Sequence, residues 1–160
     1  MSVIRAPDPR SGFTLLEVLI TLVIVAVGLL GLAKLQLNAI RFTQSAQLRT
    51  QALLLGHDIL ERMRTNRTMA LNGAYTIGFE ALHPDPSDCQ ATPCTPAQMA
   101  AHDLTRWKQD LASLLPDGDG EISRIDSGGQ ESLFHIAIRW DDDRRHTVVS
   151  FKTFSLESEL

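Results

Sequence analysis

The chain has 160 residues, a formal net charge of −4 at pH 7 and 44% hydrophobic residues. This length suits one small domain joined to a long helix. The mildly acidic balance provides no positive field for phosphate backbones. We therefore expect no direct binding of nucleic acid through bulk electrostatics.

A short polar segment at residues 1–12 precedes a long apolar one. Residues 18–33 are apolar except for one threonine, and the 21 residues of 13–33 are enough to cross a bilayer as a helix. Arg5 and Arg10 precede this span. The positive-inside bias therefore predicts a single-pass protein of the inner membrane, with a cytoplasmic N-terminus and a periplasmic C-terminal part.

A lone carboxylate, Glu17, lies at the N-terminal edge of the apolar run. A charged side chain at mid-bilayer costs about 2.5–3.5 kcal/mol even on lenient insertion scales. A secretory signal peptide would carry a small-x-small cleavage site after its apolar stretch, and here the stretch leads into Lys34 instead. A plain signal anchor fits the length but leaves Glu17 unexplained, so we interpret Glu17 as a functional residue.

Residues 12–17, Gly-Phe-Thr-Leu-Leu-Glu, followed by the apolar run, resemble the class III leader of type IV pilins and the related pseudopilins. Counted from Phe13, Glu17 is the fifth residue, the position that the family requires. The resemblance implies that prepilin peptidase cleaves between Gly12 and Phe13 and methylates the new amino group of Phe13. Glycine before the cleaved bond leaves the backbone unhindered for the peptidase.

Cleavage would create an ammonium group on Phe13 that can neutralise an acid. In a fibre of axially staggered subunits, Glu17 of one subunit can meet the terminal amine of a neighbour. Each charge then avoids being unpaired in apolar surroundings, which is the costly state. We therefore expect Glu17 to drive subunit assembly.

Several further segments resemble the PilV branch of minor pilins. They are residues 28–32, 35–37, 58–66, 114–116 and 138–140, together with Trp107. This resemblance implies a minor pilin that enters the type IV pilus (fimbrium) and supports its assembly or initiation, with motility or adhesion as the result. The implied partners are prepilin peptidase, other minor pilins, the major pilin, the inner-membrane assembly platform and a tip adhesin. A minor pseudopilin of a type II secretion system and a competence minor pilin for DNA uptake stay open.

The helical pattern continues beyond the span through residues 34–67. An apolar stripe at helical spacing marks the face that we expect to pack under a globular head at residues 68–160. The stripe consists of Leu48, Ala52, Leu55, Ile59 and Met63. Residues 13–67 are thus expected to form one helix, and Asn72-Gly73 breaks the pattern.

Residues 82–96 are interpreted as a loop because they hold four of the seven prolines. This loop also contains Cys89 and Cys94, the only cysteines. In the oxidising periplasm we expect them to form a disulfide, worth about 2 kcal/mol for so short a loop. A zinc site formed with His83 and His102 is the alternative, although the spacing matches no compact zinc finger.

A second helix is predicted at residues 96–115. Thr95-Pro96-Ala97-Gln98 is a capping box with proline at the first helical position, and Trp107 is interpreted as a core residue. Strands are predicted at residues 121–125, 133–140 and 147–154, the last two joined by a polar turn. A short strand at residues 75–79 is also indicated by alternation. The expected fold class is α+β and pilin-like, with a small antiparallel sheet packed on the long helix.

The sequence contains no recognisable catalytic motif, so we expect a structural protein that is not an enzyme and holds no metal or cofactor. Residues 117–121, Asp-Gly-Asp-Gly-Glu, faintly resemble the start of a calcium loop, but the later bidentate acid is missing. We interpret them as a turn. The three aspartates 141–143 and the pair His57-Asp58 are expected to be solvated.

Overall fold

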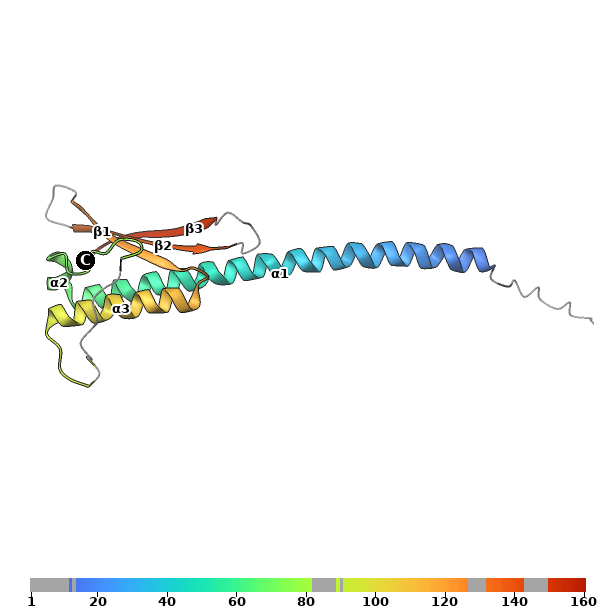
Figure 1. Ribbon diagram of the computed structural model, residues 1–160. Coiled ribbons are helices and arrows are strands. Elements are labelled where there is room, and N and C mark those ends of the chain that lie inside the picture. The colour runs from blue at the N-terminus through green and yellow to red at the C-terminus, as the bar shows by residue number, and fades with distance from the viewer. Residues whose placement is uncertain (1–11, 13, 82–88, 90, 127–131, 143–149) are drawn as a thin grey trace, which may run out of the picture. The chain divides into compact units, whose positions relative to one another are not determined.

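The computed structural model describes residues 12, 14–81, 89, 91–126, 132–142 and 150–160 (Figure 1). The helices are α1 (Leu15–Thr65), α2 (Arg67–Leu71) and α3 (Pro96–Leu114), and the strands are β1 (Asp119–Asp126), β2 (Ser132–Asp141) and β3 (Phe151–Glu159). The chain divides into two compact units, the first ending at Thr43 and the second comprising Gln44–Leu160.

The first unit is the N-terminal part of α1. All of its described side chains are exposed, and most of them are apolar. Leu15 is 83% exposed and Phe42 is 77% exposed. By length and composition this helix could cross a membrane. Its hydroxyl groups are satisfied within the helix, because Thr21 Oγ1 donates to the carbonyl oxygen of Val18 at 2.8 Å and Thr43 Oγ1 to that of Ala39 at 2.9 Å.

The second unit has one hydrophobic core between the C-terminal part of α1, helix α3 and one face of the sheet. Figure 1 shows α3 running beside α1, with the three strands covering the pair. The largest fully buried side chains include Ile59, Met63, Tyr75, Leu104, Trp107, Leu111, Ile122, Phe134, Ile136 and Ile138. Trp107 Nε1 donates to the carbonyl oxygen of Leu55 at 3.0 Å, which ties α3 to α1. The predicted α+β, pilin-like fold is confirmed.

The sheet is antiparallel with strand order β1-β2-β3. Its third strand differs from the predicted range 147–154, because β3 begins at Phe151 and continues to Glu159; residues 147–149 lie outside the described residues. In β3, half-buried Phe154, Leu156 and Ser158 alternate with exposed residues. The alternation Phe154-Ser155-Leu156-Glu157 has this period of two, so the signal for a longer strand was present in the sequence.

Two predictions for the segment after α1 are wrong. The long helix ends at Thr65, before the predicted residue 67, and Asn66 precedes the short helix α2. Residues 75–79 form no strand; Ile77 makes a single antiparallel bridge with Ile122 of β1. The reason is local, because the backbone turns through positive φ at Gly73 (φ 83°) and Glu80 (φ 59°) and leaves too few extended residues to pair.

The aspartates at the end of β2 are not solvated as predicted. Asp141 is 6% exposed, and its backbone N–H donates to the carbonyl oxygen of Pro116 at 2.8 Å. Asp142 accepts a hydrogen bond from Ser45 Oγ at 3.0 Å and forms an ion pair with Lys152 at 3.0 Å. These contacts arise because this end of the sheet meets α1. Residue 143 lies outside the described residues.

Two glycines at the start of β1 permit a close approach to α3. A Cβ atom on Gly118 would overlap the carbonyl oxygen of Leu111. One on Gly120 would overlap the Trp107 ring and lie 2.8 Å from Leu111 Cδ1. Residues 117–121 therefore need glycine for packing as well as for turning.

We predict that Gly120→Ala destabilises the second unit by about 1–3 kcal/mol, because the added methyl group forces Trp107 out of place. Gly78→Ala is the matched control, since a Cβ there meets nothing within 4 Å. It should change stability by less than about 0.5 kcal/mol. Urea unfolding of the full chain in detergent, followed by tryptophan fluorescence, measures both. Equal stability of the two variants would contradict this packing account.

Candidate functional site

The N-terminal end of α1 holds the residues that the leader motif singles out. Gly12 and Thr14 are exposed and non-helical, and Phe13 lies outside the described residues. Thr14 caps the helix, because its Oγ1 accepts a hydrogen bond from the backbone N–H of Glu17 at 3.3 Å. Its carbonyl oxygen accepts the N–H of Val18, also at 3.3 Å. The helix thus begins directly after the residues proposed for cleavage.

Sequence reasoning missed this cap although the signal was present. Thr14-Leu15-Leu16-Glu17 has the Thr-x-x-Glu spacing of a capping box. The first half of that box, from the Glu17 N–H to the Thr14 hydroxyl, is formed.

Glu17 lies in the first turn of α1, where the helix dipole favours a negative charge. The surrounding surface is apolar, with Leu16 and Ile20 exposed on the adjacent positions. Among the described residues, no ion pair includes Glu17. The geometry is that of an unpaired carboxylate on an apolar helix, which is where a cation from another molecule would stabilise it.

The second unit holds a buried polar network around Asp103, which is 6% exposed. Tyr75 donates its hydroxyl hydrogen to Asp103 Oδ2 at 2.7 Å, and Arg62 Nη1 donates to Asp103 Oδ1 at 3.2 Å. Burial and the Asp103 hydrogen bond raise the pKa of Tyr75 well above its usual value. Burial lowers the pKa of Arg62, but hydrogen bonds to Asp58 and Asp103 outweigh it and raise that pKa overall. Asp58 is therefore paired with Arg62, and its sequence neighbour His57 is exposed.

A second charged cluster centres on Asp119 at the start of β1. Lys108 Nζ contacts Asp119 Oδ1 at 2.5 Å, and Arg139 Nη2 contacts Oδ2 at 3.4 Å. The Glu80 N–H donates to Oδ2 at 2.6 Å. Arg139 also stacks on the ring of Phe79, 4.3 Å from its centroid. Basic side chains therefore neutralise the carboxylate that the calcium-loop interpretation would have assigned to a metal.

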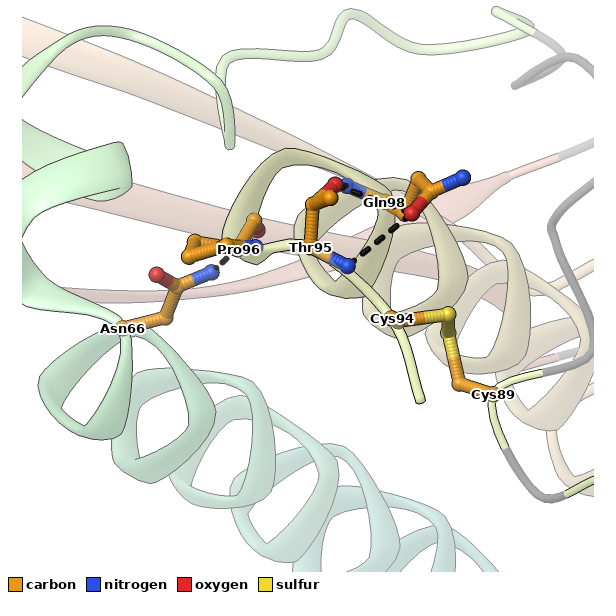
Figure 2. Close-up of a disulfide and its surroundings, with 6 residues drawn as sticks. All are labelled: Asn66, Cys89, Cys94, Thr95, Pro96 and Gln98. Atoms are coloured by element: carbon orange, nitrogen blue, oxygen red, sulfur yellow. Dashed lines mark hydrogen bonds between the residues drawn. A yellow bond between two sulfur atoms is a disulfide. The ribbon is translucent and has the colours of Figure 1, made fainter. Parts of the chain in front are cut away.

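The cysteines form the expected disulfide just before α3 (Figure 2). The Cα atoms of Cys89 and Cys94 are 5.3 Å apart. The predicted capping box follows at once: Thr95 Oγ1 accepts the N–H of Gln98 at 3.3 Å, and Gln98 Oε1 accepts the N–H of Thr95 at 2.9 Å. The zinc alternative fails because neither bonded sulfur is a thiolate ligand; its other ligand His83 lies outside the described residues.

The first residue of α3 is hydrogen-bonded to the residue that follows α1. Asn66 Nδ2 donates to the carbonyl oxygen of Pro96 at 2.7 Å, as Figure 2 shows. The same nitrogen donates to the hydroxyl of Tyr75 at 3.3 Å. Asn66, which lies between α1 and α2, therefore links the start of α3 to the Asp103 network.

Two family models match this chain. Residues 8–33 match the prokaryotic N-terminal methylation motif, and residues 34–105 match the family described as type IV pilin Tt1218. These matches support assignment to the type IV pilin superfamily. Comparison with curated proteins and with solved structures found no match.

Type IV pilins are processed by prepilin peptidase and assemble with other pilins. The match to the methylation motif covers Gly12 to Glu17, where helix α1 begins. The exposed apolar helix of the first unit fits a pilin anchored in the inner membrane. The pilin family is structural, in keeping with the absence of a recognised catalytic motif in the sequence.

Acid should weaken the second unit through Asp119. Burial raises the pKa of its carboxyl, but the hydrogen bonds from Lys108, Glu80 and Gly120 outweigh burial and hold it below its usual range. A depressed folded-state pKa gives stability that is present above the unfolded value of about 4 and is lost as the pH falls through the folded value.

We therefore predict that Asp119→Asn lowers the melting temperature at pH 7, and that its difference from the wild type shrinks as the pH falls below about 4. Thermal unfolding of both proteins between pH 7 and pH 2, followed by circular dichroism, measures this difference. A gap that stays constant over the whole range would rule out the ionised Asp119 carboxylate as its source.

Proposed function

We propose that this chain is a PilV-like minor pilin that enters type IV pili and supports their assembly or initiation, and hence pilus-dependent motility or adhesion. The observation that carries the proposal is the motif of residues 12–17 at the start of an exposed apolar helix, with Glu17 in its first turn. The PilV resemblance in residues 58–66, 114–116 and 138–140 supports the narrower assignment.

The mechanism starts with processing of the leader, residues 1–12. Prepilin peptidase cleaves between Gly12 and Phe13 and methylates the amino group of Phe13, which stays a cation. The exposure of Gly12 and the helix start at Leu15 support access to this bond. Before assembly, residues 13–33 span the inner membrane, and residues 34–67 continue the helix into the periplasm below the head at 68–160.

Glu17 then recruits the subunit into the fibre. A carboxylate beside lipid is costly, and its pairing with the Phe13 ammonium of a neighbouring pilin removes that cost. The exposed apolar side chains of the same helix are covered in the same step. The partners in this step are other minor pilins, the major pilin and the inner-membrane assembly platform, with a tip adhesin at the fibre end.

A deletion strain distinguishes this proposal from its rivals. Loss of surface pili and of twitching motility supports a minor pilin of the type IV pilus. Loss of exoprotein secretion with pili intact would instead assign the chain to the pseudopilins of a type II secretion system. Loss of transformation with twitching intact would assign it to a competence system.

We predict that Glu17→Ala protein still inserts into the membrane and loses its leader, but is absent from pili sheared from the cell surface, because it cannot neutralise the neighbour's ammonium. Immunoblots of membrane and sheared fractions measure both steps. Glu61→Gln is the matched control, since Glu61 is an exposed acid of the second unit and should leave recovery unchanged. Wild-type recovery of Glu17→Ala protein in pili would refute the pairing.

A further inference from the structure

The two edges of the sheet are not equally protected. At the β1 edge, Ile77 and Ile122 exchange two backbone hydrogen bonds of 3.0 and 2.8 Å, so the segment after α2 covers part of it. At the β3 edge, no backbone group of the described residues outside β2 is hydrogen-bonded to the strand. Within the described part of the chain, the backbone donors and acceptors on the outer side of β3 therefore have no partner in another segment.

Strand β3 also lacks most of the features that protect edge strands. It is nine residues long, contains no proline, and pairs with β2 without a bulge from Phe151 to Glu159. On the side of β3 that faces α1, the only charged residue is Lys152, the second residue of the strand. A long regular edge of this kind is a template for an added strand.

The side chains of β3 that face α1 have apolar surface left to bury. Phe154 and Leu156 pack on the core and lie beside Gly56 of α1, yet they are only half-buried. Their partners across the ladder, Ile138 and Ile136 of the central strand, are fully buried. Phe154 and Leu156 are less buried than Ile138 and Ile136 because β3 has a neighbouring strand on one side only. A strand added at its outer edge would cover both side chains.

Cationic side chains lie at both ends of this half-buried pair. Arg64 Nη2 donates to Ser158 Oγ at 3.3 Å, and its side chain is 47% exposed. Lys152, six residues from Ser158 along the strand, is 59% exposed. Each already contacts one carboxylate, Glu61 and Asp142 respectively, but both retain donors for another.

We propose that β3 binds an extended strand of a partner protein whose side chains toward α1 follow the order acid-x-apolar-x-apolar-x-acid. The two acids lie opposite Ser158 and Lys152, and the two apolar residues lie opposite Leu156 and Phe154. The period of two matches a β-strand, and main-chain hydrogen bonds supply the rest of the affinity. This binding site lies in the second unit, and the proposal does not depend on the proposed processing of the leader.

A second copy of this chain is a poorer occupant of the edge. In an antiparallel pairing that sets Phe154 of one copy opposite Leu156 of the other, Lys152 of the second copy lies opposite Ser158. It would then lie close to Arg64, and two like charges repel. The charge arrangement favours an acidic partner strand instead.

A labelled, end-capped peptide tests this proposal. The peptide Thr-Glu-Thr-Val-Thr-Val-Thr-Glu-Thr is titrated with the purified full chain in detergent micelles, and fluorescence anisotropy reports binding. We expect saturable binding, and slower amide hydrogen exchange in β3 when the peptide is bound. A peptide with lysine in place of both glutamates should bind much more weakly.

Charge reversal locates the site. Arg64→Glu and Lys152→Glu should each weaken binding of the glutamate peptide about tenfold and improve binding of the lysine peptide. Arg106→Glu, an equal charge change at an exposed arginine of α3, is the matched control and should have no effect.

The proposal would be overturned by the absence of saturable binding, by equal binding of the glutamate and lysine peptides, or by an equal loss of binding in Arg106→Glu. Reversible dimerisation of the chain that protects β3 from exchange would instead assign the edge to a second copy, and so would also overturn it. Because the unprocessed chain is used, failure here leaves the proposed pilin function untouched.

Discussion

The interaction on which the proposed assembly depends is the pairing of Glu17, a carboxylate that forms no ion pair with the described part of the chain. Glu17 is carried on the first turn of a helix whose exposed surface is otherwise almost entirely apolar. Burial of that surface in lipid or among other helices is favourable for the leucines and costly for the acid. In the assembly that we propose, a cation from a neighbouring subunit pairs with Glu17 and removes this cost, so the acid favours assembly over the isolated state.

The long helix α1 meets two different surroundings along its length. The side chains of its N-terminal part are exposed and mostly apolar, whereas Ala52, Ile59 and Met63 are buried in the core of the second unit. Around that core, charges are paired inside the unit: Arg62 with Asp103, and Lys108 with Asp119. Among the described residues, these acids of the second unit are thus paired with basic side chains, whereas Glu17 of the first unit forms no ion pair.

Local signals in the sequence predicted a large share of this structure. The Thr95–Gln98 capping box and the short-range disulfide each depend on residues close together in the sequence, and each is present. The burial of Trp107 was predicted from the apolar face of its own helix. The leader motif is equally local, and the family match to residues 8–33 agrees with it.

Several features that sequence reasoning missed are contacts between distant segments. The need for glycine at positions 118 and 120 comes from Leu111 and Trp107 of α3, and the burial of Asp142 comes from Ser45 of α1. Periodicity along one strand does not reveal either contact. The open edge of β3 likewise became visible only once the strand order was known. Residues 12–17 could be singled out from sequence alone, because their chemistry does not depend on the fold of the head.

The most direct test of the account is the mass and N-terminal sequence of the mature chain. The full-length gene product is isolated from membranes of cells that contain prepilin peptidase, and mass spectrometry determines its first residue. The account predicts a chain that begins with N-methylated Phe13, because only cleavage creates the ammonium group that neutralises Glu17. A chain that retains Met1 and the uncleaved leader, with Phe13 never freed, would contradict it.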